Sequence, residues 1–211
     1  MFNVITPLNR WNNLNKLTNM LEPHNIKWHI ITDSDSIEKI EINKKWINHY
    51  ICPNNEKEFF ERCNFSINWF IENQKIIENE FYCFLNDDDA YENNFFEKIQ
   101  LAINNEQNNE EHKNILLCSM QRGDNIPQDA IPIRRHPTTK LWALPNMIGV
   151  GMTGIEQIIL KGKILKKYRI PLLSDGDGRF IMKILLENKF TLVPEADILF
   201  NYYEPGRWNN V

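Results

Sequence analysis

The sequence predicts an α/β fold with a mostly parallel central sheet flanked by helices, and a smaller mixed or antiparallel sheet in the second half. Apolar runs alternate with stretches of helical periodicity through residues 1–120, which is the pattern of βαβ units. Residues 81–85 are apolar throughout, as expected of a parallel strand that is buried on both faces. Beyond residue 120 this alternation stops, and the chain is divided into short segments by prolines at positions 127, 132, 137, 145 and 171.

Each element is expected from a local pattern. Strands are expected where apolar runs end at a proline or a polar residue, at 2–6, 26–32, 46–52, 81–85, 115–120 and 190–193. Helices are expected where apolar residues recur every third or fourth position, at 11–21, 56–79, 95–103 and 175–188. Shorter pieces are expected at 141–144 and 147–152. We therefore expect one domain of two lobes over residues 1–211, or one such domain of a longer polypeptide.

Composition excludes several classes of protein. The chain has 211 residues, 42% of them hydrophobic, and a net charge of -4, so it lacks the basic surplus that is typical of a nucleic-acid binder. No apolar stretch is long enough for a membrane span. None of the four cysteines forms a CxxC pair, so free thiols in a reducing compartment are expected. The expected location is the cytoplasm.

Three adjacent aspartates, Asp87, Asp88 and Asp89, follow the apolar run at 81–85 without a gap. At the carboxyl end of a parallel strand they would lie where open α/β sheets bind ligands. Adjacent carboxylates repel one another and raise each other's pKa values, and a hard divalent cation such as Mn²⁺ or Mg²⁺ would relieve that repulsion. The alternative is a solvated acidic turn, because aspartate is favoured in turns.

A second group of residues follows the first two expected strands. Thr6, Pro7 and Arg10 come after the first strand and Asp33 ends the second, so the two segments would form one wall of a mononucleotide site. The sequence contains neither the GxGxxG pattern of dinucleotide folds nor the GxxxxGK[ST] pattern of a P-loop, which disfavours both classes.

Two segments of the second half carry polar groups suited to an acceptor. Asp175 opens the helix at 175–188, where the helix dipole keeps a carboxylate ionised and able to act as a general base, or where it simply caps the helix. The remaining candidates lie between 127 and 152 and could bind phosphate, an acidic acceptor or a sugar ring: Arg134, Arg135, His136 and Trp142. A solvated basic turn and a core tryptophan are the alternatives for these residues.

The order of these motifs resembles that of GT-A-fold glycosyltransferases with a DxD motif. The shared features are ITPxxR at the first strand, TD at the end of the second, DDD after a buried strand, and an acidic residue opening a helix that leads to VPEA. The segment from SDGDGRF to VPEA is similar to the family-2 pattern, and ITPLNRW with the triple aspartate is similar to the glucuronyltransferase branch. Ser174 departs from the family-2 pattern, which has Glu there, and Asn201 stands near the place of a metal-binding His.

This resemblance implies a GT-A-like, metal-dependent glycosyltransferase that moves a sugar from a UDP-sugar to a hydroxyl of a carbohydrate or glycoprotein acceptor. Residues 1–120 would bind the nucleotide sugar, and residues 121–211 would bind the acceptor and supply the catalytic residues. Thr6, Pro7 and Arg10 would line the base and phosphates, and Asp33 would accept a hydrogen bond from N3–H of uracil.

The same resemblance implies roles for the acidic residues. Asp89 would be the main ligand of Mn²⁺ or Mg²⁺, and Asp87 and Asp88 would lie near the ribose or bind the metal through water. Asp175 would be the general base, with Asp177 as a second acid. Two alternatives stay open: a nucleotidyltransferase that makes a nucleotide sugar, and a non-catalytic nucleotide- or carbohydrate-binding domain. The first normally has a glycine-rich loop after strand one, and ITPLNRWNN contains no glycine.

Overall fold

The computed structural model describes residues 1–33, 44–53, 59–105, 112–122 and 154–200. The strands in these residues are β1 (Phe2–Pro7), β2 (Ile26–Asp33), β3 (Ile47–Cys52), β4 (Phe81–Phe84), β5 (Ala90–Tyr91), β6 (Ile115–Arg122), β7 (Ile158–Lys161) and β8 (Thr191–Phe200). The α-helices are α1 (Leu14–Leu21), α2 (Phe59–Asn73), α3 (Phe95–Asn104), α4 (Gly162–Leu165) and α5 (Gly176–Glu187). Turns of 3-10 helix lie at Trp11–Asn13, His112–Asn114 and Ile155–Gln157.

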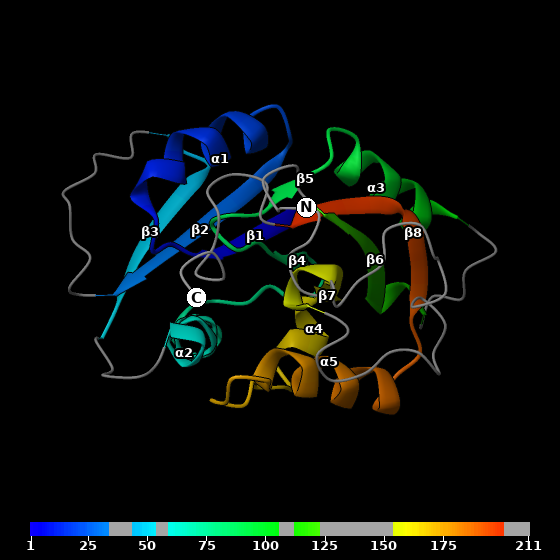
Figure 1. Ribbon diagram of the computed structural model, residues 1–211. Coiled ribbons are helices and arrows are strands. Elements are labelled where there is room, and N and C mark those ends of the chain that lie inside the picture. Colours follow the sequence, from blue (N-terminus) through cyan, green and yellow to red (C-terminus); the bar gives the residue numbers. More distant parts are fainter. Residues whose placement is uncertain (34–43, 54–58, 106–111, 123–153, 201–211) are drawn as a thin grey trace.

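Within this described part of the chain the strands form one eight-stranded sheet in the order β3-β2-β1-β4-β7-β6-β8-β5 (Figure 1). Parallel pairs join β1 to β2 and β4, β2 to β3, and β6 to β8. The strand β7 runs antiparallel to β4 and β6, and β5 runs antiparallel to β8. The predicted α/β class with a mostly parallel sheet is therefore confirmed. The antiparallel strands continue the same sheet.

The central strands are buried on both faces, as residues 81–85 predict. Successive side chains of a strand point to opposite faces, so Cys83 joins one core cluster and Phe84 the other. Helices α1 and α3 cover one face of the sheet, and α2, α4 and α5 cover the opposite face (Figure 1). Apolar side chains of these helices pack into the two core clusters. The sheet is thus held in position from both sides, and its carboxyl edge is left for the loops.

The helix expected at 56–79 is shorter than its apolar pattern suggests, because α2 ends at Asn73. Beyond it, the N–H of Ile77 donates to the hydroxyl of Tyr82 at 2.9 Å, and the buried Ile76 packs into the core. The backbone of Gly162 lies so close to Ile77 that an added Cβ would meet the Ile77 carbonyl oxygen at 2.2 Å. Tertiary contacts therefore override helical periodicity at this point.

The last strand is longer than the expected 190–193. Its pairing with β6 changes register between Cys118 and Ser119, because Cys118 is opposite Val193 whereas Ser119 is opposite Asp197. The irregularity coincides with Pro194, which has no N–H to donate to a neighbouring strand. Pairing then resumes and continues to Phe200. The proline thus interrupts the ladder without ending the strand.

Some elements were not expected. The strand β7 lies in the four-residue run IILK, and the short strand β5 follows the aspartate triplet. The short pieces expected at 141–144 and 147–152 lie outside the described residues. No helix in the described part of the chain combines the length and the apolarity needed to cross a bilayer.

All four cysteines are free thiols, as expected, and Cys83 and Cys118 are buried.

A buried polar chain crosses the sheet near its amino edge. The side chain of Asn3 donates to Glu80 at 2.9 Å, so its oxygen faces His29, whose Nε2 lies at 3.0 Å. The other ring nitrogen of His29 lies 3.3 Å from the hydroxyl of Tyr50. Burial, with a smaller effect from Lys27, lowers the pKa of His29 from 6.5 to about 4. The ring is therefore neutral in the folded protein.

We expect His29 to make the fold less stable in acid. Its folded pKa lies below its unfolded value, so the stability it contributes is complete above pH 6.5 and is lost as the pH falls toward 4, by up to about 3 kcal/mol. Urea unfolding between pH 8 and pH 4 should show a smaller acid-induced loss for His29→Gln than for the wild type. His24→Gln, at a half-buried histidine, serves as the control and should change the profile less.

Candidate functional site

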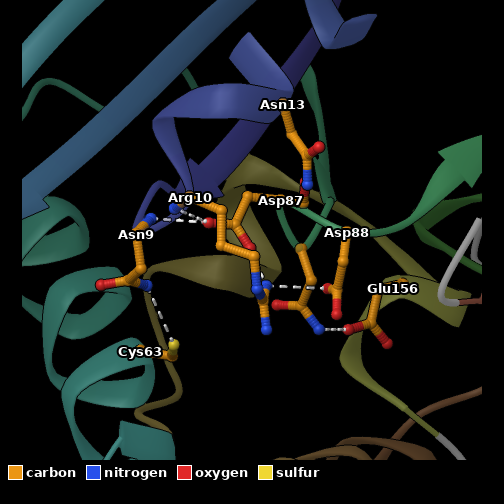
Figure 2. A network of polar contacts seen from close by, with 8 residues as sticks. Asn9, Arg10, Asn13, Cys63, Asp87, Asp88 and Glu156 are labelled. Atoms are coloured by element: carbon orange, nitrogen blue, oxygen red, sulfur yellow. Dashed lines mark hydrogen bonds and ion pairs between the residues drawn. The ribbon is translucent and has the colours of Figure 1, made fainter. Parts of the chain in front are cut away.

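The loops that follow β1 and β4 leave the sheet at the same edge. Backbone bonds continue the ladder just past both strands: Leu8 N–H donates to the carbonyl of Ile31 at 2.8 Å, and Leu85 N–H donates to that of Ile5 at 3.0 Å. Beyond them, Asn9, Arg10 and Asn13 of the first loop contact Asp87 of the second directly (Figure 2). The aspartate triplet therefore lies at the carboxyl edge of the parallel strands, as the sequence predicts.

Asp87 joins the two loops. One oxygen of its carboxylate, Oδ2, accepts the backbone N–H groups of Asn9 and Arg10, each at 2.6 Å. The other, Oδ1, pairs with the guanidinium of Arg10. The main-chain oxygen of Asp87 accepts the side-chain amide of Asn13 at 2.9 Å. With a side chain only 2% exposed, Asp87 is a buried anion matched by nearby donors.

Arg10 also contacts the second aspartate. Its Nη1 lies 3.3 Å from Oδ1 of Asp88, so one guanidinium bridges two carboxylates (Figure 2). Burial raises the pKa of Asp88 to about 6, Arg10 opposes this effect, and the negative charge of Asp87 adds to it. The carboxyl group of Asp88 therefore exchanges its proton near pH 6, well above the range of an ordinary aspartate.

The third aspartate closes the turn and is fully buried. Asp89 N–H donates to the carbonyl of Asn86 at 3.2 Å, which folds residues 86–89 into a single turn. The side chain of Asn86 donates to Glu156, which is 3% exposed and lies in the 3-10 turn before β7. A carboxylate from the second half of the chain thus joins the site (Figure 2).

One turn of α2 connects three segments that the sequence analysis singled out. Nη1 of Arg62 lies 3.7 Å from the carboxylate of Asp33 at the end of β2. The thiol of Cys63 accepts the side-chain amide of Asn9 at 3.7 Å. The amide of Asn64 donates to the carbonyl of Leu173, before α5, at 3.2 Å. Burial, followed by the charge of Asp87, raises the pKa of Cys63 to about 12, so this thiol stays protonated.

The other residues predicted for the nucleotide side lie within or at the ends of the strands. Thr6 is fully buried, and its hydroxyl accepts the indole N–H of Trp28 at 2.9 Å. Pro7 is buried at the end of β1, and Asp33 is 8% exposed beside Arg62. Their predicted contacts with a base or phosphate stay predictions.

Asp175 and Asp177 lie at the start of α5. The carboxylate of Asp175 pairs with Arg179, at 2.8 Å from Nη2 and 2.9 Å from Nε. This hydrogen bond lowers the pKa of Asp175, so the group is ionised, exposed and already bound to a cation. Asp177 accepts the N–H of Gly178 at 2.7 Å.

The candidates for the acceptor side lie outside the described residues: Arg134, Arg135, His136 and Trp142.

Sequence reasoning missed Glu156 and the turn of α2 at residues 62–64. Glu156 is 70 positions from its partner Asn86, and it belongs to none of the motifs in the sequence. Its apolar neighbours, Ile155 and Ile158, could have shown that this glutamate is buried, and a buried carboxylate calls for a partner.

The chemistry of the donors suits a hard divalent cation, because carboxylates are the ligands that Mg²⁺ and Mn²⁺ prefer. Yet among the described residues no group of three or more His, Cys, Asp and Glu side chains is arranged to hold a metal ion. Asp87, predicted as one ligand, is bound to Arg10 and to two backbone N–H groups. A cation at this edge would therefore rely on one or two carboxylates together with oxygens of the substrate.

Comparison with known proteins identifies the fold alone. Neither a protein-family model nor a curated protein matches the sequence. Among solved structures, the chain is similar to the crystal structure of Francisella tularensis 2-C-methyl-D-erythritol 4-phosphate cytidylyltransferase, with a TM-score of 0.50 and 8% sequence identity. The match covers 99% of this chain and 95% of that chain. The chain thus shares the α/β fold of that cytidylyltransferase.

We expect Asp88→Asn to be more stable than the wild type at pH 8. The folded pKa of about 6 exceeds the ordinary 3.8, so the stability contributed by this group is complete below pH 3.8 and is lost as the pH rises through 6. A neutral amide avoids this loss, which is at most about 3 kcal/mol, and the advantage of the variant should shrink toward pH 4. Urea unfolding at several pH values measures it. The exposed Glu78→Gln is the matched control and should change little; a less stable Asp88→Asn at pH 8 would contradict the expectation.

Proposed function

We propose that this protein is a transferase that binds the phosphates of a nucleotide at the edge where β1 and β4 end. The observation that carries this proposal is the guanidinium of Arg10, held by Asp87 and Asp88 at the carboxyl edge of parallel strands. Ligands of open α/β sheets bind at that edge. Guanidinium groups suit phosphate in charge and in geometry. The likeness to a cytidylyltransferase supports the same conclusion at the level of the fold.

Nucleotidyl transfer to a phosphorylated acceptor is the first candidate reaction. An acceptor phosphate oxygen attacks the α-phosphorus of a nucleoside triphosphate, the bond to the β-phosphate breaks, and pyrophosphate leaves. The attacking oxygen is already ionised, so the reaction needs no carboxylate base. This suits a chain in which Asp175 is bound to Arg179. Arg10 would stabilise negative charge that builds on the phosphates.

Glycosyl transfer from a UDP-sugar to a carbohydrate or glycoprotein hydroxyl is the second candidate. The order of ITPxxR, TD, DDD and the acidic start of a helix favours it. Asp175 would then take the proton of the acceptor hydroxyl, which requires its carboxylate to leave Arg179. In either reaction we propose that residues 1–120 mainly bind the nucleotide and residues 121–211 mainly bind the acceptor.

For a divalent cation, Asp88 and Asp89 are the carboxylates we propose as ligands, with the remaining positions filled by phosphate oxygens and water. When bound, Mn²⁺ or Mg²⁺ would neutralise charge on the phosphates and help the leaving group to depart.

The products of turnover distinguish the two reactions. We expect the purified chain with Mg²⁺ to release pyrophosphate from a nucleoside triphosphate and a sugar phosphate, in a screen of all four triphosphates. Release of UDP from a UDP-sugar, with no pyrophosphate from any triphosphate, would assign glycosyl transfer instead. Binding of no nucleotide at all in calorimetry, with or without Mg²⁺ or Mn²⁺, would contradict the proposed function.

Asp175→Asn gives an independent test of the same choice. If the reaction is nucleotidyl transfer, the variant should keep its turnover within a few-fold. If Asp175 is the base of a glycosyl transfer, turnover should fall by about 10²–10⁴-fold while nucleotide binding is unchanged. Glu72→Gln, which removes another exposed carboxylate paired with an arginine, is the control for loss of surface charge.

A further inference from the structure

We infer that Asp87 is a positioning residue that fixes Arg10 for phosphate binding, and that it is neither a metal ligand nor a ribose contact. This inference rests on the proposed function. The carboxylate of Asp87 holds both the loop after β1 and the guanidinium that this loop carries. Arg10 is then a resident cation of the site, in place before any ligand arrives.

The first support is the number of donors around the carboxylate. A carboxylate offers about four lone-pair positions. In Asp87 donors fill three of them: two backbone N–H groups bind Oδ2 at 2.6 Å, and the guanidinium of Arg10 binds Oδ1. The side chain is 2% exposed, so little of it can be reached from outside. A metal ion would have to reach the one remaining position, on Oδ1 beside the positively charged guanidinium of Arg10, or displace one of these donors.

The second support concerns the backbone of the loop after β1. In many nucleotide-binding folds the N–H groups of this loop cradle the phosphates. Consecutive N–H groups that point to one place form an anion-binding concavity. Here the N–H groups of Asn9 and Arg10 converge in this way, and the anion that they bind is Asp87 of the same chain. Because these N–H groups are already bound to Asp87, the side chain of Arg10 is the group that would bind phosphate.

The third support is the difference between the two aspartates that Arg10 contacts. Nη1 of Arg10 contacts one oxygen of each carboxylate, but Asp87 is also held by two backbone N–H groups of the same loop, whereas Asp88 lies 3.3 Å from Nη1. A phosphate that approaches the guanidinium competes more easily with Asp88 than with Asp87. Asp88 would then be released toward the ligand, while Asp87 keeps Arg10 in place.

The test compares Asp87→Asn, Arg10→Gln and the double variant by calorimetry with pyrophosphate, UDP, CTP and the corresponding nucleosides, in EDTA. We expect each single variant to weaken binding of the phosphate-bearing ligands at least tenfold, and the double variant to be no weaker than Arg10→Gln alone. The nucleosides should bind equally to all four proteins. Glu80→Gln, a partly buried carboxylate near the amino edge of the sheet, is the matched control and should bind like the wild type.

A second measurement addresses the metal. With nucleotide at a concentration that saturates every variant, Asp87→Asn should keep the wild-type Mn²⁺ affinity, whereas Asp88→Asn should lower it. Loss of Mn²⁺ affinity in Asp87→Asn, with unchanged pyrophosphate binding in EDTA, overturns the inference. If Asp87→Asn does not fold, Arg10→Lys replaces it, because lysine keeps the charge and loses the guanidinium fork. Wild-type phosphate affinity in Arg10→Lys would likewise overturn the inference.

If the wild type binds none of these ligands, the proposed function fails, and the phosphate role of Arg10 fails with it. The anchoring role of Asp87 is then measured separately, from urea midpoints of the wild type, the two single variants and the double variant. Non-additive midpoints support the anchor, and additive midpoints refute it.

Discussion

The geometry of the candidate site depends on how the carboxylate of Asp87 is removed from water. A buried anion without donors would strongly destabilise the fold. The loop after β1 supplies those donors through two backbone N–H groups and the guanidinium of Arg10. The same bonds determine where Arg10 lies, and the bond from Asn13 to the Asp87 carbonyl fixes the other end of the loop. One interaction thus satisfies a requirement of folding and places the main cation of the site.

Buried carboxylates near Asp87 carry more negative charge than the guanidinium of Arg10 neutralises. Asp88 and Glu156 are also withdrawn from solvent at this edge. Burying a charged carboxylate costs free energy, and at Asp88 this burial raises the pKa to about 6. At Asp175, which is exposed and paired with Arg179, the pKa moves in the opposite direction. Groups with strongly shifted pKa values are concentrated in functional sites more often than elsewhere. By this criterion the edge near Asp88 is a better centre for chemistry than the start of α5.

The sequence was most informative where a local pattern agrees with the tertiary structure. The apolar run at 81–85 followed by three aspartates predicts both a buried strand and acidic groups at its carboxyl edge, and both are present. Predictions from local sequence patterns were wrong where contacts between distant residues determine the ends and the pairing of an element. Tyr82 and Gly162 end α2 early, and Pro194 breaks the pairing of β8 without ending it. The partners of Asp87 could not be predicted, because nothing local shows that its carboxylate points back to residues 9 and 10.

The path of the chain explains why the site is not confined to the first half. The strand β7 lies between β4 and β6, although it follows both in sequence. Its insertion brings the preceding 3-10 turn, and with it Glu156, against Asn86 at the end of β4. The loop before α5 is likewise bound to α2 through Asn64. Residues beyond position 120, such as Glu156 and Leu173, therefore contact site residues of the first half directly. Under the proposed function, a ligand bound at Arg10 would lie near groups from both halves, as transfer between two substrates requires.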